Sequence, residues 1–163
     1  MAYKLSDIEE NKEITKRYKD LLKGAYQTFS TQDKKEIRKA FDIAVEAHRK
    51  QRRKTGEPFI FHPIAVAKIV AYEIGLDTTS IVAALLHDVV EDTDYTLEDI
   101  ERLFGENVAR IVNGLTKISH LKKDQDASVQ AENFRKMLLT LNDDVRVILI
   151  KIADRLHNMQ TMD

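Results

Sequence analysis

The chain has 163 residues, enough for one well-buried core and few for two domains. Charged residues make up 33% of it but cancel to a formal net charge of -1, so no overall field favours nucleic acid or an anionic membrane surface. The lack of cysteine excludes disulfides and thiolate zinc sites, and because no apolar run approaches the roughly 18 residues of a membrane span, we expect a cytoplasmic protein.

The first half of the sequence predicts helices. Glycine and proline are scarce, and apolar residues recur at helical spacing, which indicates an all-α fold. A charged helix over about residues 6–23 precedes a second over about 31–50, whose apolar face includes His48. Residues 51–61 contain glycine and proline and are predicted to form a loop.

The next two predicted helices carry histidines at their ends. His62 precedes Pro63, and proline is favoured at the first helical position, so His62 is expected to start a helix that runs to about Ile74. The following helix, over about 78–91, opens with an apolar run and ends in the acidic segment 87–92.

Further helices complete the predicted fold. Thr96 begins a segment that resembles a capping box, which opens a short helix ending at Gly105. Residues 119–126 are polar and are expected to form a mobile loop. The other predicted helices lie around residues 108–115, 127–141 and 143–162. Because the chain ends inside the last of these helices, we expect it to be a fragment cut from a longer protein.

Four residues are candidate metal ligands, because each places a ligand side chain on an otherwise apolar helix. They are His62, His87, Asp88 and Asp154. Unpaired buried carboxylates are costly, so such groups are normally paired, protonated or bound to a cation. Two imidazoles and two carboxylates suit Mn²⁺, Fe²⁺ or Zn²⁺ better than Mg²⁺ or Ca²⁺, which prefer oxygen alone. Because imidazole binds metals only when neutral, metal affinity should fall below about pH 6.

Each candidate ligand has a simpler explanation when taken alone. His62 could cap its helix, His87 could lie at an ordinary helix end, and Asp154 could pair with Arg146 or Arg155. Four such coincidences on apolar helices are harder to dismiss together. The other histidines are weaker candidates, with His48 in the core or behind the site, His120 in a polar loop and His157 beside the site.

A basic run precedes His62. Five positive charges fall within residues 49–54, namely Arg49, Lys50, Arg52, Arg53 and Lys54. Such runs are usually solvated surface, but a position beside a candidate metal ligand favours contacts with nucleotide phosphates. Arg53 could also stack on a purine.

Three segments resemble the RelA/SpoT homologue family, and more narrowly its HD-type (p)ppGpp hydrolase domain. They are His48–Pro63, Leu86–Thr93 and Ile152–Met159, with 104–109 and 114–117 also in agreement. The resemblance covers roughly residues 31–163. It implies an all-α HD-domain helical bundle, truncated at its C-terminal end, with residues 1–30 as a helical extension in the same compact unit.

The resemblance also implies an activity. The family removes the 3′-pyrophosphate of ppGpp and pppGpp in the stringent response, using one Mn²⁺ ion, and yields GDP or GTP. The family pattern places metal ligands at His62, His87, Asp88 and Asp154, a catalytic acidic pair at Glu91 and Asp92, and nucleotide contacts at Arg53, Lys54, Thr55, Asn158 and Thr161. Glu91 lies one helical turn after His87, so the acidic pair is expected to orient and deprotonate a metal-bound water.

Two alternatives stay open at the level of the sequence. One is an HD phosphohydrolase that acts on another nucleotide, and the other is an inactive, nucleotide-binding regulatory fragment. The parent protein is expected to carry a downstream synthetase domain, as long family members do. Direct binding to nucleic acid or membrane is not expected of this domain.

Overall fold

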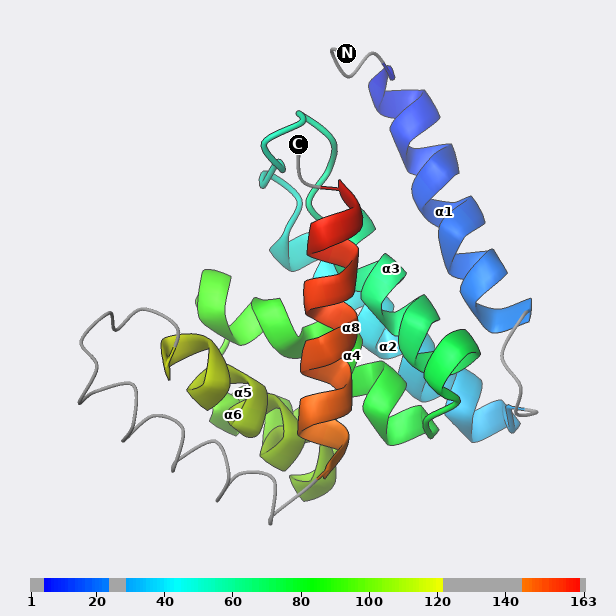
Figure 1. The fold of residues 1–163 in the computed structure, drawn as a ribbon. Helices are drawn as coiled ribbons and strands as arrows, with labels where there is room; N and C mark the ends of the chain where they lie inside the picture. Colours follow the sequence, from blue (N-terminus) through cyan, green and yellow to red (C-terminus); the bar gives the residue numbers. More distant parts are fainter. Residues whose placement is uncertain (1–4, 24–28, 122–144, 162–163) are drawn as a thin grey trace.

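The computed structural model describes residues 5–23, 29–121 and 145–161, with residues 119–121 described by their backbone alone. Helices dominate these ranges (Figure 1), and the described residues form no β-strand beyond one isolated bridge between Arg52 and Pro58. The helices are α1 (Asp7–Lys23), α2 (Thr31–Ala47), α3 (Phe61–Lys68), the π-helix η1 (Ile69–Ile74), α4 (Thr78–Asp92), α5 (Leu97–Phe104), α6 (Glu106–Leu121) and α8 (Val145–Thr161). The all-α prediction is confirmed.

Local sequence signals start several of these helices. The Ser30 side chain accepts a hydrogen bond from the Asp33 amide at the start of α2, and Thr96 does the same for Asp99 at the start of α5. In both cases the aspartate side chain accepts a hydrogen bond from the backbone amide of the cap residue, which completes a capping box. The capping box predicted at Thr96 is therefore present.

Helix α4 lies at the centre of the fold, behind α8 in Figure 1. It packs against α2, α3 and α6, and its residues Ser80 to His87 are all buried. A helix surrounded in this way must be apolar on every side, which explains the uninterrupted run from Ile81 to Leu86. Helix α8 crosses over α3, η1 and α6 and brings its buried face to the same centre.

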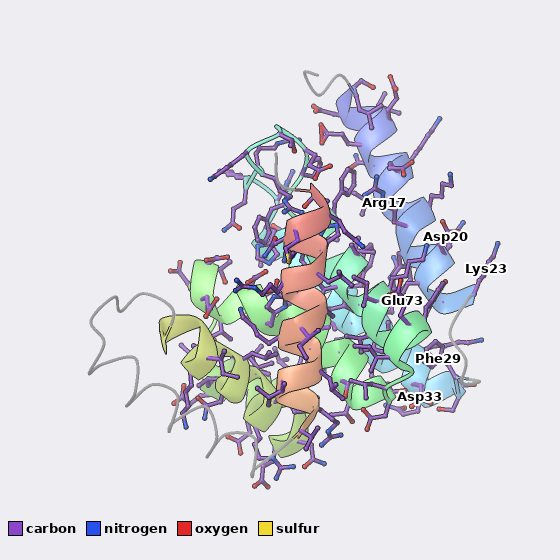
Figure 2. All side chains as sticks on the ribbon, in the orientation of Figure 1. Arg17, Asp20, Lys23, Phe29, Asp33 and Glu73 are labelled. Carbon is purple, nitrogen blue, oxygen red and sulfur yellow. The ribbon has the colours of Figure 1, made fainter. Side chains whose placement is uncertain are left out.

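Helix α1 packs along the outside of α3 (Figure 1) and joins the same core. Tyr18 stacks on Phe41 of α2, with ring centroids 4.2 Å apart, and Leu21 is fully buried. Figure 2 shows Arg17 on the side of α1 that faces the rest of the protein, where its guanidinium lies 3.9 Å from the centroid of the Phe61 ring. The charged first segment thus buries one face against the helices that follow.

Two helix boundaries differ from the sequence-based expectation. Helix α2 ends at Ala47, so His48 is its C-cap rather than part of its interior. Helix α3 begins at Phe61, two residues before Pro63, because the amides of Phe61 and His62 already bond back to the loop carbonyls of residues 58 and 59. In this first turn the missing N–H of Pro63 costs no helical bond. His62 therefore lies inside the first turn and is not a cap.

The predicted helix through Ile74 is interrupted. Its second half is the π-helix η1, in which the Gly75 amide bonds to the Val70 carbonyl at 2.9 Å. Gly75 has a φ of 76°, a left-handed conformation that favours glycine, and it ends the helix as expected. Apolar periodicity does not distinguish a π-turn from an α-turn, so the sequence did not reveal this change.

The predicted loop at residues 119–126 is wrong in its first part, because α6 continues to Leu121. The rest of that loop and the predicted helix over 127–141 lie outside the described residues. Within the described ranges, no helix combines the length and the apolar character needed to cross a membrane.

Candidate metal centre

The four predicted ligands come together from three helices. His62 comes from the first turn of α3, His87 and Asp88 from the second half of α4, and Asp154 from the middle of α8. Each offers one ligand atom, and the four atoms all lie within 4.8 Å of one another. His62, His87 and Asp154 are at most 6% exposed, so the cluster lies beneath the surface.

The distances between these atoms are compatible with one ion. His87 Nε2 lies 3.1 Å from Asp88 Oδ2 and 3.4 Å from Asp154 Oδ1, and His62 Nε2 lies 4.0 Å from Asp88 Oδ2. Metal bonds of about 2.0–2.2 Å place the ligands of one ion about 3–4.4 Å apart. The remaining contact, 2.6 Å between His62 Nε2 and Asp154 Oδ1, would have to lengthen.

The hydrogen bond made by Nδ1 of His87 determines the protonation of its other ring nitrogen, Nε2. Nδ1 lies 2.6 Å from the Ala84 carbonyl oxygen, which can only accept, so Nδ1 carries the proton. In the neutral ring Nε2 then presents a lone pair to the carboxylates of Asp88 and Asp154, and it is buried without a hydrogen bond. Histidines that bind metals commonly donate their other N–H to a backbone carbonyl in this way.

A similar chain fixes His62. His157 Nδ1 lies 3.3 Å from an Arg53 guanidinium nitrogen, and because arginine only donates, His157 Nδ1 is an acceptor. Burial, with His62 and Arg53 close by, lowers the pKa of His157 to about 4, which keeps this ring neutral. His62 Nδ1, 2.7 Å from the same atom, must then donate to it. Its Nε2 lies 2.6 Å from Asp154 Oδ1, a carboxylate oxygen that only accepts, so this nitrogen donates to Asp154 unless a cation takes the place of the proton.

Two imidazole lone pairs that face two carboxylates repel them unless a positive charge lies between. A proton can supply that charge: burial opposes the charged form of His87, but Asp88 and Asp154 outweigh it and raise its pKa to about 9. A divalent cation can supply it equally well. The donor set therefore fits a metal ion, and its nitrogen and oxygen composition fits a transition metal.

Lys151 completes the surroundings of Asp154 and was missed by the sequence analysis. Its Nζ lies 3.0 Å from Asp154 Oδ2, which leaves Oδ1 for the centre. Although burial opposes it, the hydrogen bond from His62 together with the charges of His87 and Lys151 holds the pKa of Asp154 far below its usual range. The i, i+3 spacing of Lys151 and Asp154 on a helix could have revealed the pair. The alternative pairing with Arg146 is wrong, because Arg146 lies 2.8 Å from Asp77.

The predicted acidic pair lies at the end of α4. Glu91 and Asp92 are both exposed and stand in its final turn, outside the four-ligand cluster. The Asp92 carbonyl accepts a hydrogen bond from Gln51 Nε2 at 3.0 Å. Gln51 was not identified from the sequence, because a glutamine after a helix end carries no distinctive signal.

Three of the five predicted substrate contacts also lie together. One Arg53 nitrogen, Nη2, lies 3.1 Å from Asn158 Oδ1 and 3.0 Å from Thr161 Oγ1. These bonds hold the loop between α2 and α3 against the end of α8, as Figure 1 shows. Lys54 and Thr55 are exposed in the turn that follows Arg53. The contacts described for the Arg53 guanidinium are hydrogen bonds and an ion pair, and none of them is a stacking contact with a ring.

The basic run is partly neutralised. Arg52 lies 2.7 Å from Glu10 of α1, which is buried, so this charge is committed to packing α1 on the loop. Arg49 lies 3.8 Å from Glu46 in an exposed pair. The expectation that all five charges serve the substrate is therefore too broad, and Arg53 is the member that reaches the metal cluster through His157.

Comparison with known proteins identifies relatives of this chain. A model of the HD domain matches residues 40–163. The bifunctional (p)ppGpp synthase/hydrolase SpoT of Escherichia coli K12 is 51% identical over 137 residues, which are 83% of this chain and 19% of that protein. The guanosine-3′,5′-bis(diphosphate) 3′-pyrophosphohydrolase of Aquifex aeolicus is 50% identical over 131 residues, or 80% of this chain and 18% of that protein. The resemblance predicted from the motifs is confirmed.

A solved structure has a similar fold. It belongs to a metazoan orthologue of SpoT described as hydrolysing ppGpp and playing a role in starvation responses. The two chains are 29% identical and superpose with a TM-score of 0.59, over 82% of this chain and 72% of that one. This chain spans about a fifth of the length of the two sequence relatives above.

Proposed function

We propose, since this chain belongs to the HD domain family, that it is the catalytic part of a hydrolase that removes the 3′-pyrophosphate of ppGpp and pppGpp. The observation that carries the proposal is the convergence of His62, His87, Asp88 and Asp154, in which Nε2 of both imidazoles faces the two carboxylates. The names of the relatives supply the substrate class. We assign one Mn²⁺ ion to the cluster, because this mixed nitrogen and oxygen set suits it.

The residues around the cluster divide the work of hydrolysis. A divalent cation bound here would supply a water of lowered pKa and a Lewis acid for phosphate oxygens. Glu91, one turn after His87, accepts the proton of the attacking water, and Asp92 orients it. Water adds to the phosphorus that is bonded to the ribose 3′ oxygen. The bond between that phosphorus and the 3′ oxygen breaks, and the 3′ oxygen leaves as a hydroxyl once it is protonated.

Arg53 connects the substrate loop to this chemistry. Its guanidinium bonds to His157, Asn158 and Thr161, and His157 in turn bonds to the proposed ligand His62. A nucleotide phosphate held by Arg53 and Lys54 would lie next to the metal cluster. Of the five substrate contacts proposed from the family pattern, Arg53 bonds to Asn158 and Thr161, and Lys54 and Thr55 follow it in the same loop.

A comparison of substrates tests the proposal. The purified protein is given Mn²⁺ and, in separate reactions, ppGpp, GTP, a deoxynucleoside triphosphate or a cyclic dinucleotide, and pyrophosphate and phosphate release are measured. We expect pyrophosphate from ppGpp to be the fastest product, and its release by the Glu91→Gln variant to be slower by about 100-fold or more. Faster turnover of an ordinary nucleotide would point to a different HD phosphohydrolase. Tight ppGpp binding by the metal-loaded protein without turnover would point to a regulatory binding module.

A further inference from the structure

A buried histidine behind the site is held by a glutamine. His48, the C-cap of α2, is 2% exposed, and its Nδ1 lies 2.8 Å from Gln51 Oε1. The other end of the same amide, Gln51 Nε2, donates to the Asp92 carbonyl at the end of α4. A chain of two hydrogen bonds therefore runs from the core to the last residue of the helix that carries the proposed catalytic acids.

The directions of both bonds follow from the chemistry of the groups. A carbonyl oxygen only accepts, so the Gln51 nitrogen must face Asp92 and the Gln51 oxygen must face His48. His48 Nδ1 then carries the proton. Burial lowers the pKa of His48, which keeps the ring neutral, and its Nε2 has no hydrogen-bond partner among the described residues. Within the described part of the chain, the bond to Gln51 is thus the one hydrogen bond made by this buried ring.

The backbone of Gln51 organises the substrate loop. Its carbonyl accepts from the Phe59 amide at 3.0 Å, and its amide donates to the His48 carbonyl at 2.9 Å. Between these points the Arg53 amide bonds to the Glu57 carbonyl, which closes the turn that carries the predicted nucleotide contacts. One residue therefore joins the base of the substrate loop to the end of α4.

The bond to Asp92 also solves a local problem. The last carbonyls of a helix have no partner within it and need one from elsewhere. Gln51 gives such a partner to Asp92, next to Glu91, and so fixes the direction of the final turn relative to the loop. Catalytic groups lose most of their effect when they are displaced by about 1 Å, so a bond of this kind can influence the rate without contacting substrate.

We infer that Gln51 is a positioning residue, held by His48, that sets the placement of the Glu91–Asp92 pair relative to the nucleotide loop. The inference rests on the hydrolase function proposed above for its catalytic readout. The structural readout is independent of the hydrolase function, because the bond between Gln51 and Asp92 exists without substrate.

Two pairs of substitutions isolate the bonds. Gln51→Glu keeps an acceptor for His48 but loses the donor to Asp92, and Gln51→Leu loses both. His48→Asn places an amide nitrogen near the position of Nδ1 and should retain the bond, whereas His48→Leu removes it. Gln32→Leu, at an exposed position in the first turn of α2, is the matched control for a glutamine-to-leucine change.

The experiment measures kcat and KM for pyrophosphate release, Mn²⁺ binding, and amide hydrogen exchange of residues 88–93 in the purified protein. Gln51→Glu, Gln51→Leu and His48→Leu should each lower kcat by about tenfold, with KM and Mn²⁺ affinity changed by less than about threefold, and should speed exchange at the end of α4. His48→Asn should restore kcat to within about threefold of the wild type, and Gln32→Leu should match the wild type.

Two results would overturn the inference. One is a Gln51→Leu protein with wild-type kcat and unchanged exchange at residues 88–93. The other is an equal loss in His48→Asn and His48→Leu, which would indicate packing rather than a hydrogen bond. If the wild-type protein releases no pyrophosphate, the proposed function fails, and the exchange data alone still decide whether Gln51 fixes the end of α4.

Discussion

His62 and His87 differ from ordinary buried histidines in the hydrogen-bond partners of their Nδ1 atoms. His87 donates to a backbone carbonyl and His62 donates to His157, both through Nδ1, so both rings direct Nε2 inward to the carboxylates. A histidine that merely fills a core has no reason to face carboxylates in this way. The assignment of metal ligands therefore rests on proton positions fixed by neighbours as well as on proximity.

Separate substitutions should distinguish ligand from catalyst. Asp88→Ala should weaken Mn²⁺ binding by more than about 100-fold, since loss of an outer-shell partner alone costs about 10–100-fold. Glu91→Gln should keep Mn²⁺ binding and lose about 100-fold or more in turnover, because it removes a proton acceptor. Calorimetry with Mn²⁺ and a pyrophosphate-release assay measure the two quantities. Equal loss of metal in both variants would remove the division of roles.

The pH dependence of metal binding follows from the raised pKa of His87. Below about 9 the ring of the metal-free protein holds a proton that Mn²⁺ must displace, so affinity should rise by about tenfold per pH unit between pH 6 and 9. The expectation from an ordinary imidazole placed this window below about pH 6, and the two carboxylates beside the ring move it upward. Titration of Mn²⁺ at several pH values measures the slope, and a flat affinity across this range would contradict histidine ligation.

The same shift has a consequence for stability. A pKa raised from 6.5 to about 9 stabilises the metal-free fold below pH 6.5, and this contribution is lost as the pH rises to about 9. The melting temperature of the metal-free protein should therefore fall over this range. Saturating Mn²⁺ should reverse the fall, because an ion that binds only the folded state adds about 2.7 kcal/mol at 100 times its Kd.

At the scale of elements, Asp77 joins two helices that carry ligands. Its side chain caps α4 through the Ser80 amide and pairs with Arg146 near the start of α8. Although burial opposes it, bonds from Ser80 and Arg146 lower the pKa of Asp77, so its contribution is present above about pH 4 and is lost on acidification.

Substitution of Asp77 should separate the cap from the ion pair. Asp77→Ala should lower the free energy of unfolding by about 1–2 kcal/mol, because it removes both interactions. Asp77→Asn keeps a good capping side chain and should cost less than about 1 kcal/mol, as exposed ion pairs contribute little. Urea unfolding at neutral pH measures both values. Equal losses in the two variants would show that the ion pair, and not the cap, holds the start of α4.

The helices were predictable where local signals are strong, and not where tertiary contacts decide. The capping box at Thr96 and the stop at Gly75 are written in adjacent residues. The π-turn of η1 and the early start of α3 depend on hydrogen bonds that no residue pattern specifies. The ligand residues were predictable because polar groups on apolar helices are conspicuous, whereas Lys151 and Gln51 act through contacts visible only in the fold.

At the scale of the whole molecule, we expect α1 to unfold as one cooperative unit with the helices that bear the site, because it packs against α3. Leu21 of α1 is fully buried, so Leu21→Ala should cost about 2–5 kcal/mol of unfolding free energy. The exposed Lys16→Ala on the same helix should change it by less than about 0.5 kcal/mol. Circular dichroism and intrinsic tyrosine fluorescence should report one coincident transition. A separate early transition for α1 would show that residues 1–30 fold independently of residues 31–163.

One divalent cation, held by side chains from α3, α4 and α8, is central to the proposed function. Anomalous diffraction from crystals of the protein grown with Mn²⁺ tests this most directly. The prediction is a single strong peak, bonded to His62 Nε2, His87 Nε2 and one oxygen each of Asp88 and Asp154, with bonds of about 2.0–2.2 Å. Crystals that contain Mn²⁺ but show no peak at the cluster, or a peak bonded to other residues, would contradict it.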